Sequence, residues 1–327
     1  MFRCTARRLT AALVLTVAMP AFAADWPESL TREFPKADFS INAVDWSEVR
    51  SGGVSRDRIP AIDRPRAVSL AEAAETLMPT EPVVGLVING QARAYPLRVL
   101  IWHEIANDEL GGVPVAVTYC PLCNTAVVFD RRLDNRVLDF GTTGRLRNSD
   151  LIMYDRQTET WWQQFLGQAI IGTLTGAELA MIPARLESFE NFAARAPEGT
   201  VLVGDAARPY GRNPYVAYDT SPRPFLYSGP MPDQIAPLAR VVRVGEQAWS
   251  LRFLRNKGEV LAGDLRLSWT PGQNSALDAA TISEGMDVGN VVVQRQDTDG
   301  IWRDVPYSVD FAFAFAAFYP NAPIHME

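Results

Sequence analysis

The sequence predicts a β-rich α+β protein built from two related β-rich halves with a few short helices. Short runs of β-branched and aromatic residues, separated by Gly, Pro and Asn, recur along most of the chain, which is typical of strands joined by tight turns. Few segments have helical periodicity, and these are short. Parts of the second half also repeat parts of the first, which indicates a degenerate internal duplication.

Two pairs of segments carry this duplication. The matched stretches are GQARAYPLRVL (90–100) with GEQAWSLRFL (245–254), and TYCPLCNTAV (118–127) with SWTPGQNSAL (268–277). In the second pair Cys120 aligns with Thr270 and Cys123 with Gln273, while the proline and the asparagine of the turn are kept. Since the second copy retains the turn-forming residues without the thiols, we infer that folding does not require the thiols.

The first 23 residues are predicted to be a signal peptide. Arg3, Arg7 and Arg8 precede an apolar run that ends at small residues near Ala23. The run is shorter than the roughly 20 residues that span a bilayer, so we expect export and cleavage rather than a retained anchor. The paired arginines leave the twin-arginine route open beside the Sec route. The mature protein is therefore expected in the periplasm or outside the cell, with no stable membrane span.

After the signal, residues 24–57 are expected to form an N-terminal arm, because they are rich in Pro, Gly and charge. Residues 58–200 would form the first half, which carries the cysteines, and residues 201–327 the second, degenerate half. A short helix is predicted to begin after Ser69, with Glu72 as its capping-box partner.

Further along the chain, Asn89-Gly90 between two apolar runs predicts a tight hairpin. Residues 113–119 and 125–130 are β-branched strands on either side of the cysteine turn. Near the C-terminus, aromatic residues spaced i, i+4, i+7 among alanines over 311–318 predict a buried helix.

Two cysteines, Cys120 and Cys123, remain once the signal peptide is removed. A disulfide that served only to stabilise the fold would close a long loop, since closing about four residues gives only about 2 kcal/mol, against nearly 5 kcal/mol for about 100 residues. Pro121 fixes φ within the turn, and Asn124 follows at a position where a left-handed conformation is typical. The pattern therefore predicts a metal knuckle that supplies two thiolates.

His103 is predicted to be the third metal ligand, because it precedes the strand leading to Cys120 and the corresponding place in the second half has no histidine. Two thiolates and one imidazole with an open position suit copper or zinc, and export to an oxidising compartment slightly favours copper. Met153 is a conceivable soft fourth ligand, although a methionine in a strand more often packs in the core. The residues expected to orient the ligands are Glu104, Asn124, Asp150, Asp155 and Arg156.

Two other functions stay open from the sequence. Cys120 and Cys123 also fit a thiol–disulfide redox pair, but that chemistry uses a helix N-terminus to lower a thiol pKa, and the residues after Asn124 favour a strand. A non-catalytic binding or scaffold protein with a local disulfide loop is the third possibility. The sequence does not decide whether the protein is an enzyme.

The charge of the chain bears on its partners. A net charge of −7, with no basic run after the N-terminus, argues against nucleic acid as a partner. No protein or small-molecule partner is indicated by the sequence.

Four motifs together, HEIAND, VTYCPLCNTAVVFDR, GTTGRLRNSDLIMYDRQTETWW and AIIGTLTG, resemble a bacterial family, the domain-of-unknown-function family numbered 3179. The resemblance covers roughly residues 58–320 and implies an exported protein with a Thr-Tyr-Cys-Pro-Leu-Cys turn. Where that family often has Gly after the second cysteine, this chain has Asn124, which changes only the detail of the turn. The resemblance implies no reaction. The family pattern falls on His103, Glu104, Asn107, Asp108, Cys120, Pro121, Cys123, Asn148, Ser149, Asp150, Tyr154, Asp155, Arg156 and Trp161.

Overall fold

The computed structural model describes residues 26–205 and 208–327. The predicted signal peptide, residues 1–23, lies outside the described residues. None of the described helices has the length and apolar character that crossing a membrane would require.

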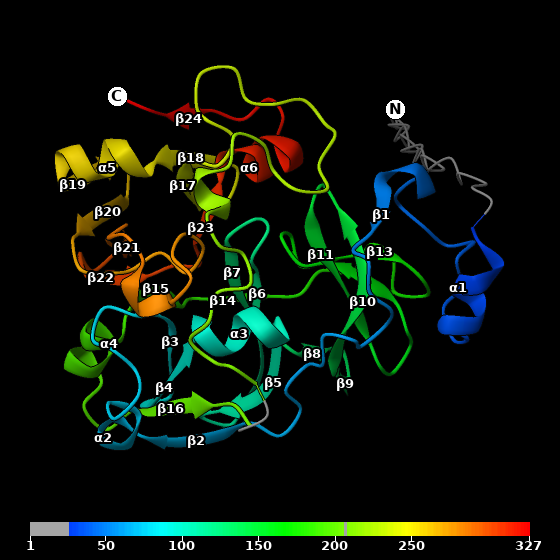
Figure 1. Ribbon diagram of the computed structural model, residues 1–327, viewed down its shortest axis with the longest axis horizontal. Coiled ribbons are helices and arrows are strands. Elements are labelled where there is room, and N and C mark those ends of the chain that lie inside the picture. The colour runs from blue at the N-terminus through cyan, green and yellow to red at the C-terminus, as the bar shows by residue number, and fades with distance from the viewer. Residues whose placement is uncertain (1–25, 206–207) are drawn as a thin grey trace, which may run out of the picture.

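The described chain consists mainly of five small sheets in a propeller-like arrangement, with short helices between them (Figure 1). This confirms the predicted β-rich class. The sheet that carries the cysteine turn is central in Figure 1, and its strands in spatial order are β14 (Met181–Ile182), β7 (Thr125–Asp130), β6 (Val113–Cys120) and β5 (Ile105–Leu110).

Two more sheets belong to the first half of the chain, together with a small ribbon of β8 (Arg132–Leu133) and β9 (Arg136–Val137). One sheet contains β15 (Arg185–Ser188), β3 (Pro82–Ile88), β4 (Gln91–Pro96), β16 (Thr200–Val203) and β2 (Arg66–Ser69). The other contains β1 (Val49–Ser51), β10 (Phe140–Arg147), β11 (Asp150–Asp155), β12 (Trp161–Gln163) and β13 (Gln168–Ile171).

The second half supplies the remaining two sheets. One is formed by β23 (Ser308–Phe311), β17 (Arg240–Val244), β18 (Gln247–Ser250) and β24 (Ile324–His325), and the other by β19 (Glu259–Ala262), β20 (Leu265–Thr270), β21 (Asn290–Gln296) and β22 (Trp302–Asp304). The α-helices are α1 (Glu28–Glu33), α2 (Leu70–Ala73), α3 (Leu97–His103), α4 (Phe189–Arg195), α5 (Leu251–Lys257) and α6 (Ala312–Phe318).

The predicted local elements are present. The Ser69 hydroxyl accepts a hydrogen bond from the Glu72 backbone N–H and so begins α2. Asn89 and Gly90 both have positive φ in the tight turn between β3 and β4. The alanine- and phenylalanine-rich segment forms α6, in which Phe313 and Phe315 are buried.

The predicted duplication is visible in the order and pairing of the elements. Each half runs through a hairpin, a helix and a second hairpin: β3–β4–α3–β5–β6 in the first half, and β17–β18–α5–β19–β20 in the second. Each half later adds a strand, a helix and a strand, with β15–α4–β16 corresponding to β23–α6–β24. In both halves the added first strand pairs antiparallel and the added last strand pairs parallel with the opening hairpin.

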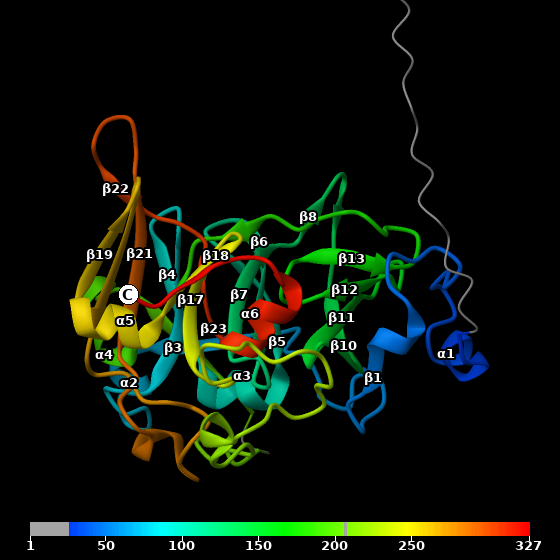
Figure 2. The ribbon, with the colours of Figure 1, turned by 90° about the horizontal axis from the view of Figure 1, so that it is seen from above.

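The sheet of β1 and β10–β13 has no counterpart among the described residues of the second half. It lies to one side of the molecule next to α1 (Figures 1 and 2). The segment expected as a surface arm thus contributes β1 to this sheet, and it buries Leu30 and Phe34 against Trp161 and its neighbours. One end of this sheet places a carboxylate next to the cysteine turn.

The two halves meet at the cysteine turn. The Phe311 backbone N–H of β23 donates to the Cys123 carbonyl oxygen at 2.9 Å, and the Asn124 side-chain amide donates to the Val309 carbonyl oxygen at 2.8 Å. Backbone of the second half therefore holds in place the turn that the first half provides.

Candidate metal centre

The cysteine turn has the conformation that the sequence predicts. Cys120 ends β6 and pairs with Thr125 at the start of β7, so the turn closes a tight hairpin. Asn124 has a φ of 54°, which is the expected left-handed conformation. Cys120 and Cys123 are free thiols, with exposed fractions of 2% and 0%.

Asp150 is the third potential ligand that the structure places beside the thiols. It follows the left-handed residues Asn148 and Ser149, which turn the chain from β10 into β11. Both sulfur atoms and one Asp150 carboxylate oxygen lie within 4.8 Å of one another. In a tetrahedral site with metal–sulfur bonds of about 2.3 Å, two thiolates are about 3.8 Å apart, so small side-chain adjustments would bring all three onto one ion.

The two oxygens of Asp150 have different environments. Oδ2 accepts hydrogen bonds from the Gln163 side-chain amide at 2.6 Å and from the Phe165 backbone N–H at 2.9 Å. Oδ1 is buried and has no hydrogen-bond partner among the described residues. A buried acceptor without a donor is costly. The unpartnered oxygen therefore fits a site that receives a cation.

The electrostatics of the site also favour a cation. Burial raises the pKa of both thiols, and burial raises the pKa of Asp150 to about 7. None of the ion pairs formed by the described residues includes Asp150, so its carboxylate has no positively charged partner among them. A bound metal ion would supply the positive charge that this group of acids lacks.

Glu104 ends helix α3 in a left-handed conformation. Its exposed fraction is 8%. Burial raises the pKa of Glu104 to about 8, with a further contribution from the negative charge of Asp150. Glu104 was expected to orient a ligand, and this stays a prediction, since Glu104 is not in the group whose ligand atoms lie within 4.8 Å of one another.

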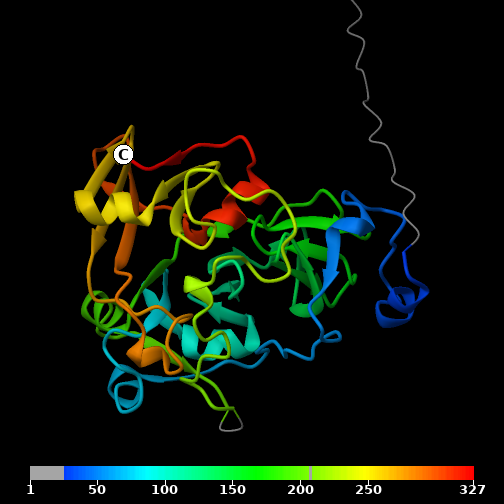
Figure 3. The ribbon, with the colours of Figure 1, turned by 45° about the horizontal axis from the view of Figure 1, so that its top comes forward.

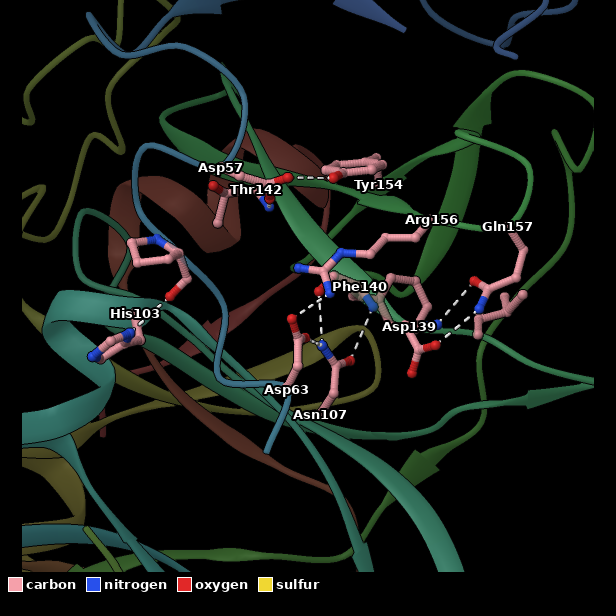
Figure 4. A network of polar contacts seen from close by, with 12 residues as sticks. Asp57, Asp63, His103, Asn107, Asp139, Phe140, Thr142, Tyr154, Arg156 and Gln157 are labelled. Atoms are coloured by element: carbon pink, nitrogen blue, oxygen red, sulfur yellow. Dashed lines mark hydrogen bonds and ion pairs between the residues drawn. The ribbon is translucent and has the colours of Figure 1, made fainter. Parts of the chain in front are cut away.

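His103 is not a member of the group. Its Nδ1 lies 2.7 Å from the Pro60 carbonyl oxygen and therefore donates to it, and its Nε2 lies 2.7 Å from the Tyr210 hydroxyl, from which it accepts. In Figure 4 the imidazole is directed at the segment that contains Asp57 and Asp63. Both ring nitrogens are thus occupied. His103, which was expected to be a ligand, instead holds the loop that contains Pro60. Helix α3 ends at His103, and the left-handed residue Glu104 then changes the direction of the chain.

Asp155 and Arg156 also belong to another network. The Asp155 carboxylate accepts from the Thr158 backbone N–H at 2.6 Å and from the Trp162 indole at 3.0 Å, so it stabilises the turn after β11. Arg156 forms an ion pair with Asp63, as Figure 4 shows. These two residues, which were expected to orient metal ligands, hold surface segments instead. Met153 is fully buried in β11, in agreement with a packing role.

A segment of the second half covers the site. The Tyr218 hydroxyl donates to the Leu122 carbonyl oxygen at 2.9 Å, and the Phe225 backbone N–H donates to that hydroxyl at 3.2 Å. The Ser149 hydroxyl donates to the Phe225 carbonyl oxygen at 2.6 Å. We call residues 215–227 the covering segment. The yellow-green part of the chain that contains it passes between α3 and α6 in Figures 2 and 3.

Sequence reasoning did not identify this cover or the role of Ser149. The signal for Ser149 was present in the sequence Asn-Ser-Asp after a strand, which is typical of a tight turn. The covering segment has no such signal, since its contacts join residues that are 76 and 96 positions apart.

Comparison with known proteins gives one result. The model of a family described as protein of unknown function (DUF3179) matches residues 56–322. No curated protein and no solved structure matches the chain.

Proposed function

The chain belongs to the DUF3179 family, and from the geometry of its site we propose that it binds one divalent metal ion through Cys120, Cys123 and Asp150. The observation that carries the proposal is the unpartnered Asp150 Oδ1, buried within 4.8 Å of two free thiols. As part of the same proposal, the protein works after export to the periplasm, as the predicted signal peptide indicates.

Zinc suits these donors better than copper. The expected histidine would have suited copper, whereas a carboxylate oxygen beside two thiolates is a donor set typical of zinc. Soft monovalent copper prefers sulfur and imidazole ligands over a hard carboxylate. The residues of the site therefore support zinc as the ion to test first.

The proposal is tested by adding zinc to the reduced, metal-free protein in competition with a chromophoric chelator. We expect one zinc ion per chain, and we expect protein purified from the periplasm to contain the same ion in near-stoichiometric amount. A chain that takes no zinc and no copper in either preparation would contradict the proposal.

Thiol–disulfide exchange is less well supported. That reaction needs an accessible thiolate, and here both thiols are buried with pKa values raised by burial. The residue after the turn begins strand β7, so the turn does not lead into a helix whose N-terminus would stabilise a thiolate.

Asp150→Asn is expected to lower metal affinity and to raise the stability of the metal-free protein at neutral pH. The variant keeps the shape of the side chain but loses its charge, so we expect zinc affinity to fall about 100-fold. The folded state holds a proton on Asp150 up to a pKa of about 7, whereas the unfolded state loses it near pH 4. The free energy of unfolding of the metal-free wild type therefore decreases as pH rises through this range.

We expect Asp150 to contribute about 2–4 kcal/mol to this decrease between pH 4 and pH 8, measured by urea denaturation, so the decrease should be smaller by that amount in Asp150→Asn, where Glu104, with a pKa raised to about 8, still contributes. Zinc should remove the decrease, because it replaces the proton. Asp264→Asn, at an exposed carboxylate, is the matched control. Equal pH dependence in wild type and Asp150→Asn would show that Asp150 is not the group responsible.

Ser149→Ala is expected to accelerate metal release. Its hydroxyl ties the covering segment to the turn that carries Asp150, and loss of one such hydrogen bond, worth about 1 kcal/mol, corresponds to roughly fivefold faster opening. The rate is measured by transfer of zinc to excess chelator. Ser221→Ala is the control, because the Ser221 hydroxyl donates only to the Arg223 carbonyl oxygen within the same exposed stretch. The same rate in both variants would argue against opening at this segment.

A further inference from the structure

Ala239 has the same place in the second half of the chain as Glu81 has in the first half. The N–H of the first residue of α4 donates to the Glu81 carbonyl oxygen at 2.9 Å, and the N–H of the first residue of α6 donates to the Ala239 carbonyl oxygen at 2.8 Å. The N–H groups of Glu81 and Ala239 each donate to the carbonyl oxygen three residues earlier, at 3.0 and 2.9 Å. The same backbone connections therefore surround both residues.

Glu81 neutralises an arginine in the first half. Its side chain is buried and forms an ion pair with Arg98, with 3.0 Å between Oε2 and Nε. Arg98 is the second residue of α3, and the second residue of α5 is Arg252. Because Ala239 has no charge, it cannot pair with Arg252. None of the ion pairs between described residues includes Arg252, and its side chain is exposed.

An open cavity lies beside α5 and is lined by both Ala239 and Arg252 (Figure 1). Its volume is about 420 Å³, within the range of about 300–1,000 Å³ that is typical of small-molecule sites. Arg255 lines the same cavity, whereas the corresponding residue of α3, Ile101, is buried in the core. Ser250 also lines it, at the N-cap position where α3 has a proline. The second half thus has an open space where the first half has a carboxylate, with polar side chains around it.

The charges around the cavity favour an anion. The two acidic residues that line it have partners within the protein, since Asp219 forms an ion pair with Arg240 and Asp287 accepts hydrogen bonds from three backbone N–H groups. Arg252 and Arg255 belong to no ion pair among the described residues; the Arg255 guanidinium lies over an indole ring, 5.5 Å from its centroid. Since residues three apart on a helix are neighbours on its surface, the two arginines can act on one ligand.

We propose that this cavity binds a small organic acid, whose carboxylate takes the place of the Glu81 side chain and pairs with Arg252. Arg255 provides the second positive charge. A guanidinium group can donate two parallel hydrogen bonds to one carboxylate. A carboxylate is also the group that the first half places against the corresponding arginine, which favours it over phosphate. The cavity shares no residue with the proposed metal ligands, so either site can exist without the other.

The site is tested by isothermal titration calorimetry of the mature protein with acetate, succinate, benzoate and citrate, and with inorganic phosphate as the competing kind of anion. The variants are Arg252→Ala, Arg255→Ala and Ala239→Glu, the last of which rebuilds the ion pair of the first half. Arg136→Ala, at an exposed arginine of β9, is the matched control. Circular dichroism and the melting temperature check that each variant folds.

We expect at least one of the four acids to bind with a dissociation constant below about 10 mM. Arg252→Ala and Arg255→Ala should each weaken this binding about tenfold or more, because each removes a charge-assisted hydrogen bond. Ala239→Glu should abolish it without lowering the melting temperature, and Arg136→Ala should bind like wild type. No saturable binding of any acid, or equal affinity in Arg252→Ala and Arg136→Ala, would overturn the site. Phosphate binding as tight as that of the best acid would overturn the assignment to carboxylates.

Discussion

Replacing Cys123 by serine is expected to abolish stoichiometric metal binding while leaving the fold in place. The thiolate is one of two sulfur donors, and a serine hydroxyl is a poor zinc ligand at neutral pH. We expect the zinc content of purified protein to fall from about one ion per chain to less than about a tenth, as measured by elemental analysis.

The fold should persist in this variant because the turn is held by hydrogen bonds that do not involve sulfur, from the Phe311 backbone N–H to the Cys123 carbonyl oxygen and from the Asn124 side-chain amide to the Val309 carbonyl oxygen. Gln273 aligns with Cys123 in the sequence, but its segment does not close a hairpin, because Thr270 pairs with Asn290. A buried serine with an unsatisfied hydroxyl costs about 1–3 kcal/mol, which a chain of this size tolerates. Gln273→Ser, at a side chain that is also buried, is the matched control, and it should keep its metal. If both variants retain equal zinc, the cysteine turn is not the binding site.

The turn could be predicted from the sequence because its determinants are local. Proline, asparagine and the flanking β-branched residues define the hairpin within about ten residues, and the observed φ of Asn124 agrees. The duplication could also be recognised from the sequence, since similar local sequence patterns occur in both halves. Local patterns of this kind depend on backbone preferences and little on tertiary contacts.

The ligand set was only partly predictable, for geometric reasons. His103 and Glu104 are neighbours in the sequence, but the helix ends between them and the left-handed residue redirects the chain. The histidine is consequently turned toward Pro60, and it is Asp150, far along the chain, that lies beside the thiols. Asp150 reaches the site because the turn of Asn148 and Ser149 places it opposite Arg147 at the start of β11. A shift of one residue would turn its carboxylate to the opposite face. The partners of this carboxylate, Gln163 and Phe165, come later in the chain, so the sequence around Asp150 does not show what it contacts.

Asp310→Ala is expected to cause a large loss of stability, because it removes the acid from a buried ion pair between β17 and β23 of the second half. Arg243 and Asp310 are 2.9 Å apart, with side-chain exposures of 4% and 0%. Removing one partner leaves the other charge buried and uncompensated, which costs about 3–5 kcal/mol. The free energy of unfolding, measured by urea denaturation at pH 7, should fall by this amount.

Asp264→Ala gives the comparison that separates burial from pairing. Asp264 and Arg295 are also 2.9 Å apart through the same atom types, but both side chains are at least half exposed, so the loss should stay below about 1 kcal/mol. Asp310 also accepts a hydrogen bond from the Thr125 hydroxyl at 2.8 Å, directly after the cysteine turn. Because this contact positions the turn, Asp310→Ala should also weaken zinc binding, whereas Asp264→Ala should not. Equal losses of stability in the two variants would show that burial does not increase the contribution of the Arg243–Asp310 pair.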